Sequence, residues 1–167
     1  MSLIEELKKV LGDQNVLTGT DKERYSSDWL GQYQFEPLCV VRPASTEEVS
    51  DIVRLARSFH VNIVPVGGNT GLNGGTHSDN AISISMERMN KIREIRLNSK
   101  IAIVEAGVIL ANLHQIVSEN DLMFPLTFGA RGSATIGGVL STNAGGSNVL
   151  KYGNTRDLVL GVEIVLP

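Results

Sequence analysis

Glycine placement is the feature of this sequence that most restricts its fold. Of the 17 glycines, all but Gly12, Gly19, Gly31 and Gly161 lie between residues 67 and 153. Four Gly-Gly pairs occur within that stretch, at positions 67–68, 74–75, 137–138 and 145–146. Glycine has no side chain to block a close approach and it tolerates positive φ. The clustering therefore indicates loops that a ligand approaches closely, rather than ordinary turns.

Charged residues are scarce in the same places. Residues 61–78 contain no Asp, Glu, Lys or Arg, and residues 122–150 contain only Arg131. An uncharged, glycine-rich backbone presents its N–H groups to an anion. The loop 65–75 follows an expected strand, and its N–H groups, with the side chains of Asn69 and Thr70, suit a diphosphate.

Two better-known phosphate motifs are excluded. No window has glycines at positions i, i+2 and i+5 after a strand, so the fingerprint of a Rossmann dinucleotide site is missing. The nearest approach to a Walker A loop, residues 132–137, is followed by Gly138 where that motif requires lysine.

Size and composition restrict the function classes. A chain of 167 residues allows one ordinary domain or two small lobes, and 42% hydrophobic with 20% charged residues is a globular composition. The net charge of -3 and the lack of a basic run argue against a nucleic-acid partner. The charged N-terminus does not resemble a signal peptide, and no apolar stretch reaches the length of about 18 residues that a membrane span needs. We expect a cytoplasmic protein.

Helix-start signals and hydrophobic periods predict the elements. The first two helices begin at capping boxes, Ser2 with Glu5 and Ser45 with Glu48. The second lies between expected strands at 38–41 and 62–66, which favours a parallel crossover.

Beyond the first glycine loop the hydrophobic period changes to two. Residues 81–86 alternate, and a turn at 98–99 joins two further alternating segments, so this part is expected to be antiparallel. Residues 108–120 predict a helix and residues 158–166 a closing strand.

Five segments, at 65–75, 105–107, 125–138, 141–146 and 151–157, resemble in this order the FAD-binding domain of the vanillyl-alcohol oxidase and p-cresol methylhydroxylase (PCMH-type) flavoprotein family. Within it they are most similar to the FAD-linked D-2-hydroxy acid dehydrogenases: glycolate oxidase FAD subunit, D-lactate dehydrogenase and D-2-hydroxyglutarate dehydrogenase. The resemblance implies an α+β fold of two lobes, an N-terminal α/β lobe with parallel strands and a second lobe with an antiparallel sheet. It further implies a helical extension over 1–37 and an FAD-binding domain over 38–167, which ends before the second lobe and a C-terminal substrate domain are complete.

The resemblance also implies which residues bind FAD. They comprise a pyrophosphate loop, a segment along the ribityl chain and flavin ring, and a strand position at the adenine. The residues are Pro65, Gly67, Gly68, Asn69, Thr70, Gly71, Leu72, Pro125, Thr127, Gly129, Ser133, Thr135, Ile136, Gly137, Gly138, Asn143, Gly145 and Ile164. No histidine stands in the pyrophosphate loop, so noncovalent FAD is expected.

No catalytic or metal-binding residue is expected in this chain, because the family carries those groups in the C-terminal domain. The three histidines, His60, His77 and His114, show no metal-ligand spacing. Cys39, in an apolar strand, is expected to be buried and inert. Arg131 is either a surface residue at a loop tip or a ligand for FAD phosphates or a substrate carboxylate.

Two smaller sets of residues are expected to be structural. Glu105 stands two residues before Gly107 and Asp157 four residues after Gly153, and both should anchor turns. The aromatic residues Trp29, Tyr33 and Phe35 should pack over the N-terminal lobe rather than stack on a flavin.

The function implied by the resemblance is the FAD-holding part of an oxidoreductase that oxidises glycolate, D-lactate or D-2-hydroxyglutarate to the 2-oxo acid. A quinone, a cytochrome or another flavoprotein would accept the electrons, and the enzyme could lie at a membrane periphery. Alone, this chain should be inactive and should self-associate through exposed apolar surface. Two alternatives stay open: a non-catalytic FAD- or nucleotide-binding or assembly subunit, and an NADPH-dependent reductase of the same superfamily that acts on a cell-wall precursor.

Overall fold

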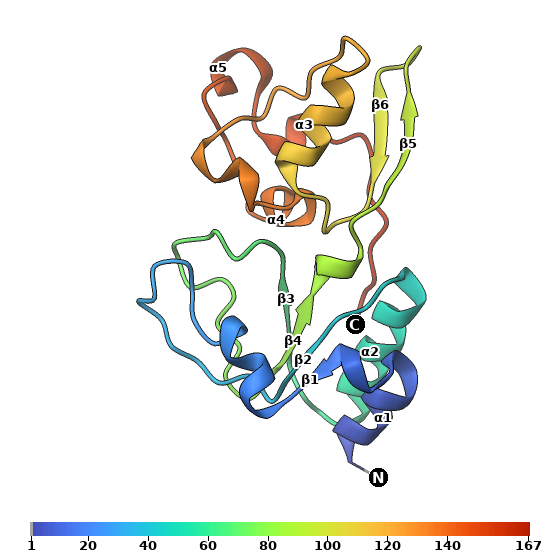
Figure 1. Ribbon diagram of the computed structural model, residues 1–167, viewed down its shortest axis with the longest axis vertical. Coiled ribbons are helices and arrows are strands. Elements are labelled where there is room, and N and C mark those ends of the chain that lie inside the picture. Colours follow the sequence, from blue (N-terminus) through green and yellow to red (C-terminus); the bar gives the residue numbers. More distant parts are fainter. Residues whose placement is uncertain (1) are drawn as a thin grey trace. The chain divides into compact units, whose positions relative to one another are not determined.

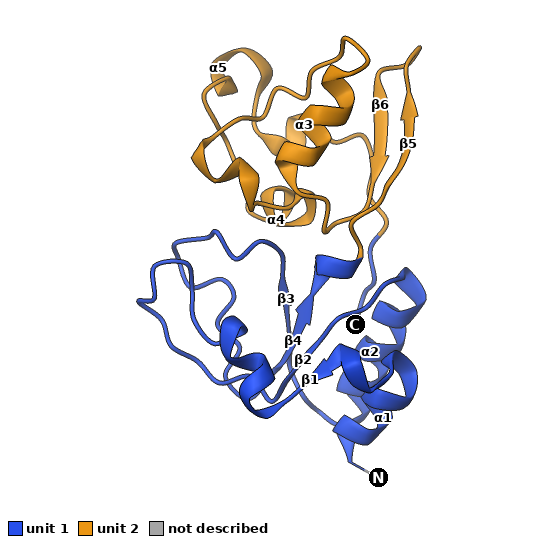
Figure 2. Cartoon of the chain, in the orientation of Figure 1, with its two compact units in different colours: residues 1–88, 164–167 blue, residues 89–163 orange. Residues whose placement is uncertain are grey.

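The computed structural model describes residues 2–167, which form two compact units (Figures 1 and 2). Unit 1 runs to Arg88 and also takes in Ile164–Pro167, and unit 2 is Met89–Glu163. Unit 1 holds a four-stranded sheet and unit 2 a two-stranded one. No helix within residues 2–167 has the length and apolar content to cross a membrane.

The sheet of unit 1 has the strand order β1-β2-β4-β3. Its strands are β1 (Val16–Leu17), β2 (Cys39–Val41), β3 (Ile63–Val66) and β4 (Ile82–Ser85). The strand β4 pairs in parallel with both β2 and β3, whereas β1 is antiparallel to β2. The predicted parallel lobe is confirmed, with β4 inserted between the two strands that flank the crossover helix.

Both predicted helix starts of unit 1 are confirmed. In α1 (Leu3–Leu11), the Ser2 hydroxyl accepts from the Glu5 N–H at 3.3 Å and the Glu5 carboxylate accepts from the Ser2 N–H at 2.8 Å. In α2 (Thr46–Ser58), the Ser45 hydroxyl caps the Glu48 N–H at 3.2 Å. The two helices pack their apolar faces on the sheet in one buried cluster: Leu7, Leu11, Val16, Cys39, Val41, Ile52, Ala56, Ile82 and Ile84.

The prediction for residues 81–86 was wrong in one respect. These residues do not belong to an antiparallel part, because β4 is a central strand of the parallel sheet. Its serines are as buried as its isoleucines: Ser83 is 0% and Ser85 1% exposed. The Ser83 hydroxyl donates to the Ser78 hydroxyl at 3.1 Å, which satisfies a buried polar group. Both faces of β4 are therefore buried, as is usual in parallel sheets, although alternation of Ile and Ser is more typical of a strand with one face in solvent.

Residues between β1 and β2 are fastened to the sheet through Glu87. Its carboxylate accepts from the Arg24 guanidinium at 3.0 Å, the Tyr25 hydroxyl at 2.8 Å and the Arg42 guanidinium at 3.1 Å. Burial alone would raise the pKa of Glu87, but the hydrogen bonds from Tyr25 and Arg42 lower it below its ordinary value. The N-terminal residues thus contribute helix α1, strand β1 and this ion cluster to unit 1.

Unit 2 begins with the antiparallel hairpin of β5 (Ile92–Arg96) and β6 (Ile101–Val104), as predicted. The predicted helix over 108–120 is confirmed as the shorter α3 (Leu110–Ser118). The glycine-rich segment that follows contains two short helices, α4 (Ile136–Ser141) and α5 (Val149–Tyr152). Unit 2 also contains short 3₁₀-helices at Gly129–Gly132 and Thr155–Leu158.

The predicted closing strand over 158–166 is not formed. After Thr155–Leu158, residues 159–167 belong to no helix or strand. Their alternating apolar side chains are mostly in solvent, with Leu160 81% and Ile164 65% exposed. A strand requires a neighbour that accepts its hydrogen bonds, and residues 2–167 pair none with this segment. The alternation of apolar residues over 158–166 therefore predicted a segment that is suited to a sheet, but it could not show whether a neighbouring strand is available to pair with it.

Candidate functional site

The predicted diphosphate loop leaves the sheet of unit 1 at the end of β3. The strands β2, β3 and β4 are parallel, so their carboxyl ends lie at one edge of the sheet. In open α/β sheets, ligands bind outside the carboxyl ends of the strands. The loop therefore starts at the edge where this architecture places a ligand.

The backbone N–H groups of this loop are not used in hydrogen bonds within residues 2–167. Among the described residues, no acceptor takes a hydrogen bond from the backbone N–H groups of residues 68–76. A Cβ atom on Gly71 or on Gly75 would meet nothing within 4 Å, so these glycines are not required by packing. Successive free N–H groups in an uncharged segment form a donor set that suits the oxygens of a diphosphate.

The Asn69 side chain is engaged within the protein. Asn69 has φ +50°, its amide nitrogen donates to the Ser27 carbonyl at 2.8 Å, and its amide oxygen accepts from the Thr76 hydroxyl at 2.7 Å. By contrast, the Thr70 hydroxyl has no partner among residues 2–167. The sequence pattern identified Asn69 but not Ser27 or Thr76. Thr76 adjoins the glycine loop and could have been suspected, whereas nothing in the sequence points to a carbonyl 42 positions earlier.

In unit 2, a few candidate groups are free for a ligand. The hydroxyls of Thr127 and Ser133 make no hydrogen bond within residues 2–167, and a Cβ atom on Gly129 would meet nothing within 4 Å. The Thr135 hydroxyl accepts from the Gly138 N–H at 3.4 Å, where it caps α4. Thr127 and Ser133 are therefore the side chains in this segment with unused hydrogen-bonding capacity.

Two candidate glycines of unit 2 have a packing role. The Gly137 N–H donates to the Ala106 carbonyl at 2.7 Å, and a Cβ atom on Gly137 would stand 2.8 Å from the Ala106 Cβ. A Cβ atom on Gly145 would stand 2.7 Å from the Asn154 amide oxygen. Because real Cβ atoms do not approach so closely, glycine at these positions is explained without a ligand.

The other candidates are spread over both units. In unit 1, Gly67 and Gly68 are half-buried, Pro65 lies on the edge strand β3, and Leu72 and Ile164 are exposed. In unit 2, Pro125 is half-buried, Ile136 packs in the apolar core, and the Asn143 amide oxygen accepts from the Arg156 N–H at 3.0 Å.

Residues outside the predicted FAD contacts behave mostly as expected. Cys39 is buried, and burial raises the pKa of its thiol to about 11. Asp157 accepts from the Asn154 N–H at 2.8 Å, so it anchors a turn as expected. Glu105 does not, because its carboxylate accepts from the distant Lys91 N–H at 2.8 Å and from Arg93 at 3.3 Å. Within residues 2–167, Arg131 is exposed and forms no ion pair.

The aromatic residues differ in burial. Phe35 is buried in unit 1, whereas Tyr33 is 44% and Trp29 58% exposed. The Tyr33 ring lies over unit 1, since it is 3.5 Å from the position that a Cβ atom on Gly74 would take. Segment 26–35 therefore joins the core at Phe35 and lies against the glycine loop at Tyr33, while Trp29 is mostly in solvent.

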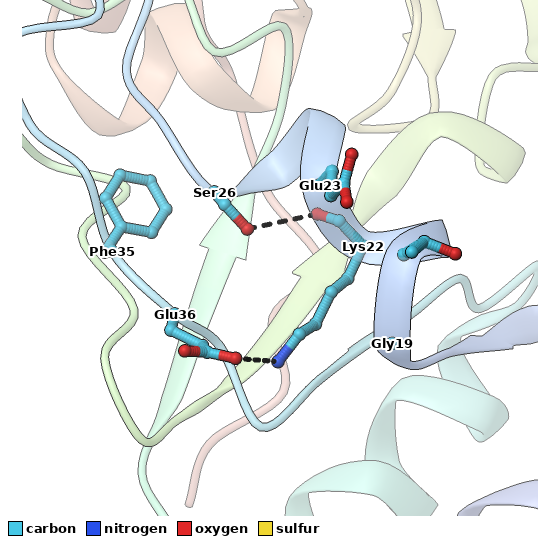
Figure 3. Close-up of a pocket in the computed structure, with 7 residues that line it drawn as sticks. Gly19, Lys22, Glu23, Ser26, Phe35 and Glu36 are labelled. Atoms are coloured by element: carbon cyan, nitrogen blue, oxygen red, sulfur yellow. Dashed lines mark hydrogen bonds and ion pairs between the residues drawn. The ribbon is translucent and has the colours of Figure 1, made fainter.

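A separate open depression occurs in unit 1 over the turn of helix at Gly19–Tyr25 (Figure 3). Lys22 reaches across it to the Glu36 carboxylate at 3.2 Å, and the Ser26 hydroxyl donates to the Lys22 carbonyl at 3.3 Å. None of the predicted FAD contacts lines this depression. Its one cationic side chain, Lys22, is already paired with Glu36, so we assign the depression no part in cofactor binding.

Comparisons with known proteins agree with this architecture. The family model described as "FAD binding domain" matches residues 37–167. A D-2-hydroxyglutarate dehydrogenase from Xanthomonas citri pv. viticola is 42% identical over 87% of this chain and 31% of its own. A putative mitochondrial D-lactate dehydrogenase from Schizosaccharomyces pombe is 34% identical over 98% of this chain and 33% of its own. The chain spans about a third of the length of these relatives.

The fold is also found in solved structures. The crystal structure of p-cresol methylhydroxylase superimposes with a TM-score of 0.71 at 24% identity, over 86% of this chain and 29% of that one. The matched segment 37–167 contains the parallel strands of unit 1 and the antiparallel hairpin of unit 2, the two sheets expected for this family. The chain therefore belongs to the FAD-binding domain family of the PCMH type, and FAD is its cofactor.

Proposed function

We propose that this chain is the FAD-holding part of an oxidoreductase that converts a D-2-hydroxy acid to the 2-oxo acid. The relatives at 34–42% identity are named as dehydrogenases of D-2-hydroxyglutarate and D-lactate, which supports this substrate class. Glycolate, D-lactate and D-2-hydroxyglutarate are the candidate substrates. FAD, when bound, supplies a two-electron acceptor, and a quinone, a cytochrome or another flavoprotein would reoxidise it.

The observation that carries the proposal is the run of free N–H groups over residues 68–76. A diphosphate has many acceptor oxygens and no donors, so it needs donors that no protein acceptor already uses. The loop offers them without a basic side chain and with room at Gly71. We propose that residues 67–72 hold the diphosphate of FAD.

Gly71→Val tests the loop. Because nothing lies within 4 Å of the new Cβ and φ is outside the left-handed region, the change should leave the fold intact. It would nevertheless place a branched side chain against the diphosphate. We expect FAD affinity to fall more than tenfold, about 1.4 kcal/mol, as measured by quenching of flavin fluorescence.

Gly161→Val is the matched control, since Gly161 also has open space around it and lies outside the loop. It should bind FAD as the unchanged chain does, and both variants should unfold at the same urea concentration as that chain. Unchanged FAD affinity in Gly71→Val would remove the loop from the site.

We further propose that FAD is bound noncovalently. No histidine lies in residues 65–75, and Cys39 is buried in the core with a thiol pKa of about 11. Acid precipitation should therefore release the flavin into the supernatant. Yellow colour that stays in the washed pellet would overturn this proposal.

A further inference from the structure

The glycine loop has to be fixed in place by something other than its own backbone. The described residues accept no hydrogen bond from its N–H groups over 68–76, and residues 71–73 are exposed. A segment of this kind loses much conformational entropy if a ligand has to order it. A loop that binds tightly is therefore expected to carry side-chain bonds that order it beforehand.

Asn69 provides these bonds. Its φ of +50° is a left-handed conformation that asparagine adopts more readily than other side chains. Its amide oxygen takes the Thr76 hydroxyl at 2.7 Å, which links the two ends of the loop. Its amide nitrogen donates to the Ser27 carbonyl at 2.8 Å, which links the loop to segment 26–35. Both bonds are partly buried, where a hydrogen bond is protected from water.

The segment that receives Asn69 is itself ordered. The Asp28 carboxylate, on a residue 4% exposed, accepts from the Tyr33 N–H at 2.9 Å. The Asp28 N–H donates to the Tyr33 carbonyl at 3.2 Å, and the Phe35 N–H donates to the Ser26 carbonyl at 3.0 Å. The Ser27 carbonyl is therefore a fixed acceptor, and Asn69 transfers this order to the loop.

We propose that Asn69 is a positioning residue: together with Thr76 and the Ser27 carbonyl, it preorganises the loop whose N–H groups bind the diphosphate. Its side chain is not itself a diphosphate ligand. This rests on the proposed function of the loop. It differs from the expectation drawn from the sequence, in which the Asn69 side chain bonds the diphosphate directly.

Thr76→Val separates the two roles. Valine matches threonine in shape but cannot donate to the Asn69 amide oxygen. One of the two side-chain hydrogen bonds of Asn69 is therefore lost, while the Asn69 side chain itself remains. We expect FAD affinity to fall about fivefold to tenfold, the effect of one partly buried hydrogen bond. Thr76→Ser keeps the hydroxyl and should restore affinity. Thr20→Val, at an exposed threonine without a side-chain bond in the described residues, is the control and should bind as the unchanged chain does.

Backbone order parameters without FAD give an independent measurement. In Thr76→Val and in Asn69→Gly, which keeps the positive φ but loses the side chain, the order parameters of residues 70–75 should fall, because the loop loses bonds that fix it. The N–H groups of Asp28, Tyr33 and Phe35 should exchange as in the unchanged chain, because segment 26–35 is ordered by its own hydrogen bonds. Wild-type FAD affinity in Thr76→Val, together with loss of binding in Asn69→Gly, would show that Asn69 contacts the diphosphate and overturn the proposal. Unchanged order parameters in both variants would also overturn it. If the unchanged chain and Thr20→Val fail to bind FAD while the order parameters of the loop still fall in the variants, the proposed function fails and the Asn69 bonds have a structural role only.

Discussion

At Gly146, a Cβ atom would stand 2.2 Å from the carbonyl oxygen of Thr127, far inside the van der Waals limit. The obstacle is backbone, which cannot rotate away as a side chain can. We expect Gly146→Ala to destabilise the protein by about 3 kcal/mol or more, a cost typical of severe overpacking. Urea unfolding measures the loss.

Gly132→Ala is the matched comparison, because a Cβ atom there meets nothing within 4 Å. It should change the unfolding free energy by less than about 0.5 kcal/mol. A stability of Gly146→Ala equal to that of Gly132→Ala would show that the backbone at Thr127 yields easily.

Cys39 permits a prediction about reactivity. Burial raises the pKa of its thiol to about 11, with the positive charge of Lys22 acting weakly in the opposite direction. The thiolate is the reactive form, and at pH 8 roughly one thiol in a thousand would carry it. A disulfide reagent should therefore label Cys39 only after urea unfolding. The raised pKa also means that stability is full below pH 9 and falls as the pH rises from about 9 towards 11, where the unfolded thiol ionises first.

At the residue scale, the sequence could predict an irregular loop after β3, because glycine and asparagine tolerate unusual backbone conformations and Asn69 does have a positive φ. The sequence could not show which glycines are required by packing and which have open space around them. Gly71 and Gly145 look alike in the sequence, yet one has open space and the other would strike Asn154. Such differences arise from contacts between residues far apart in the chain, which no local pattern records.

Among the elements, the Glu87 cluster fastens the turn of helix at Gly19–Tyr25 to the end of β4. The pKa of Glu87 is lowered in the folded protein, so its contribution to stability is present above about pH 4.5 and is lost as the pH falls through the folded pKa. We expect Glu87→Gln to lose about 1 kcal/mol at pH 7, a value reduced for partial solvent screening. The difference from the unchanged chain should shrink at pH 3, as measured by urea unfolding at both pH values. A difference that stays constant across this range would exclude the charge as its cause.

Element types were predictable where local signals and burial agree. Capping boxes predicted the starts of α1 and α2, and the apolar run 38–41 predicted β2. Two strand predictions failed for a shared reason. The pairing direction of β4 and the missing strand after Leu158 both depend on which neighbour is available, and a period of two carries no information about neighbours.

For the whole molecule, we expect no turnover by these 167 residues alone. Oxidation of a 2-hydroxy acid requires a cation for the carboxylate and a base for the hydroxyl, both within reach of C2. Between residues 122 and 150, Arg131 is the one charged residue, and no group of three or more His, Cys, Asp or Glu within residues 2–167 is arranged to hold a metal ion. Purified protein with excess FAD and an artificial electron acceptor should not reduce the dye on addition of glycolate, D-lactate or D-2-hydroxyglutarate. Sustained reduction that depends on one of these acids would show that the catalytic groups are present.

The division into units has a consequence for synthesis on the ribosome. All four strands of the sheet in unit 1 lie before Arg88, so this sheet can form once they have left the exit tunnel and before unit 2 is complete. Unit 2 is different, since Leu158 near its end packs on its buried apolar cluster around Leu110. At about 5–20 residues per second, that contact has to wait roughly 4 to 14 seconds after the strands of unit 1 have emerged. Nascent chains stalled at increasing lengths should therefore become protease-resistant in two steps, the region before residue 89 first and the region after it only once Leu158 has emerged.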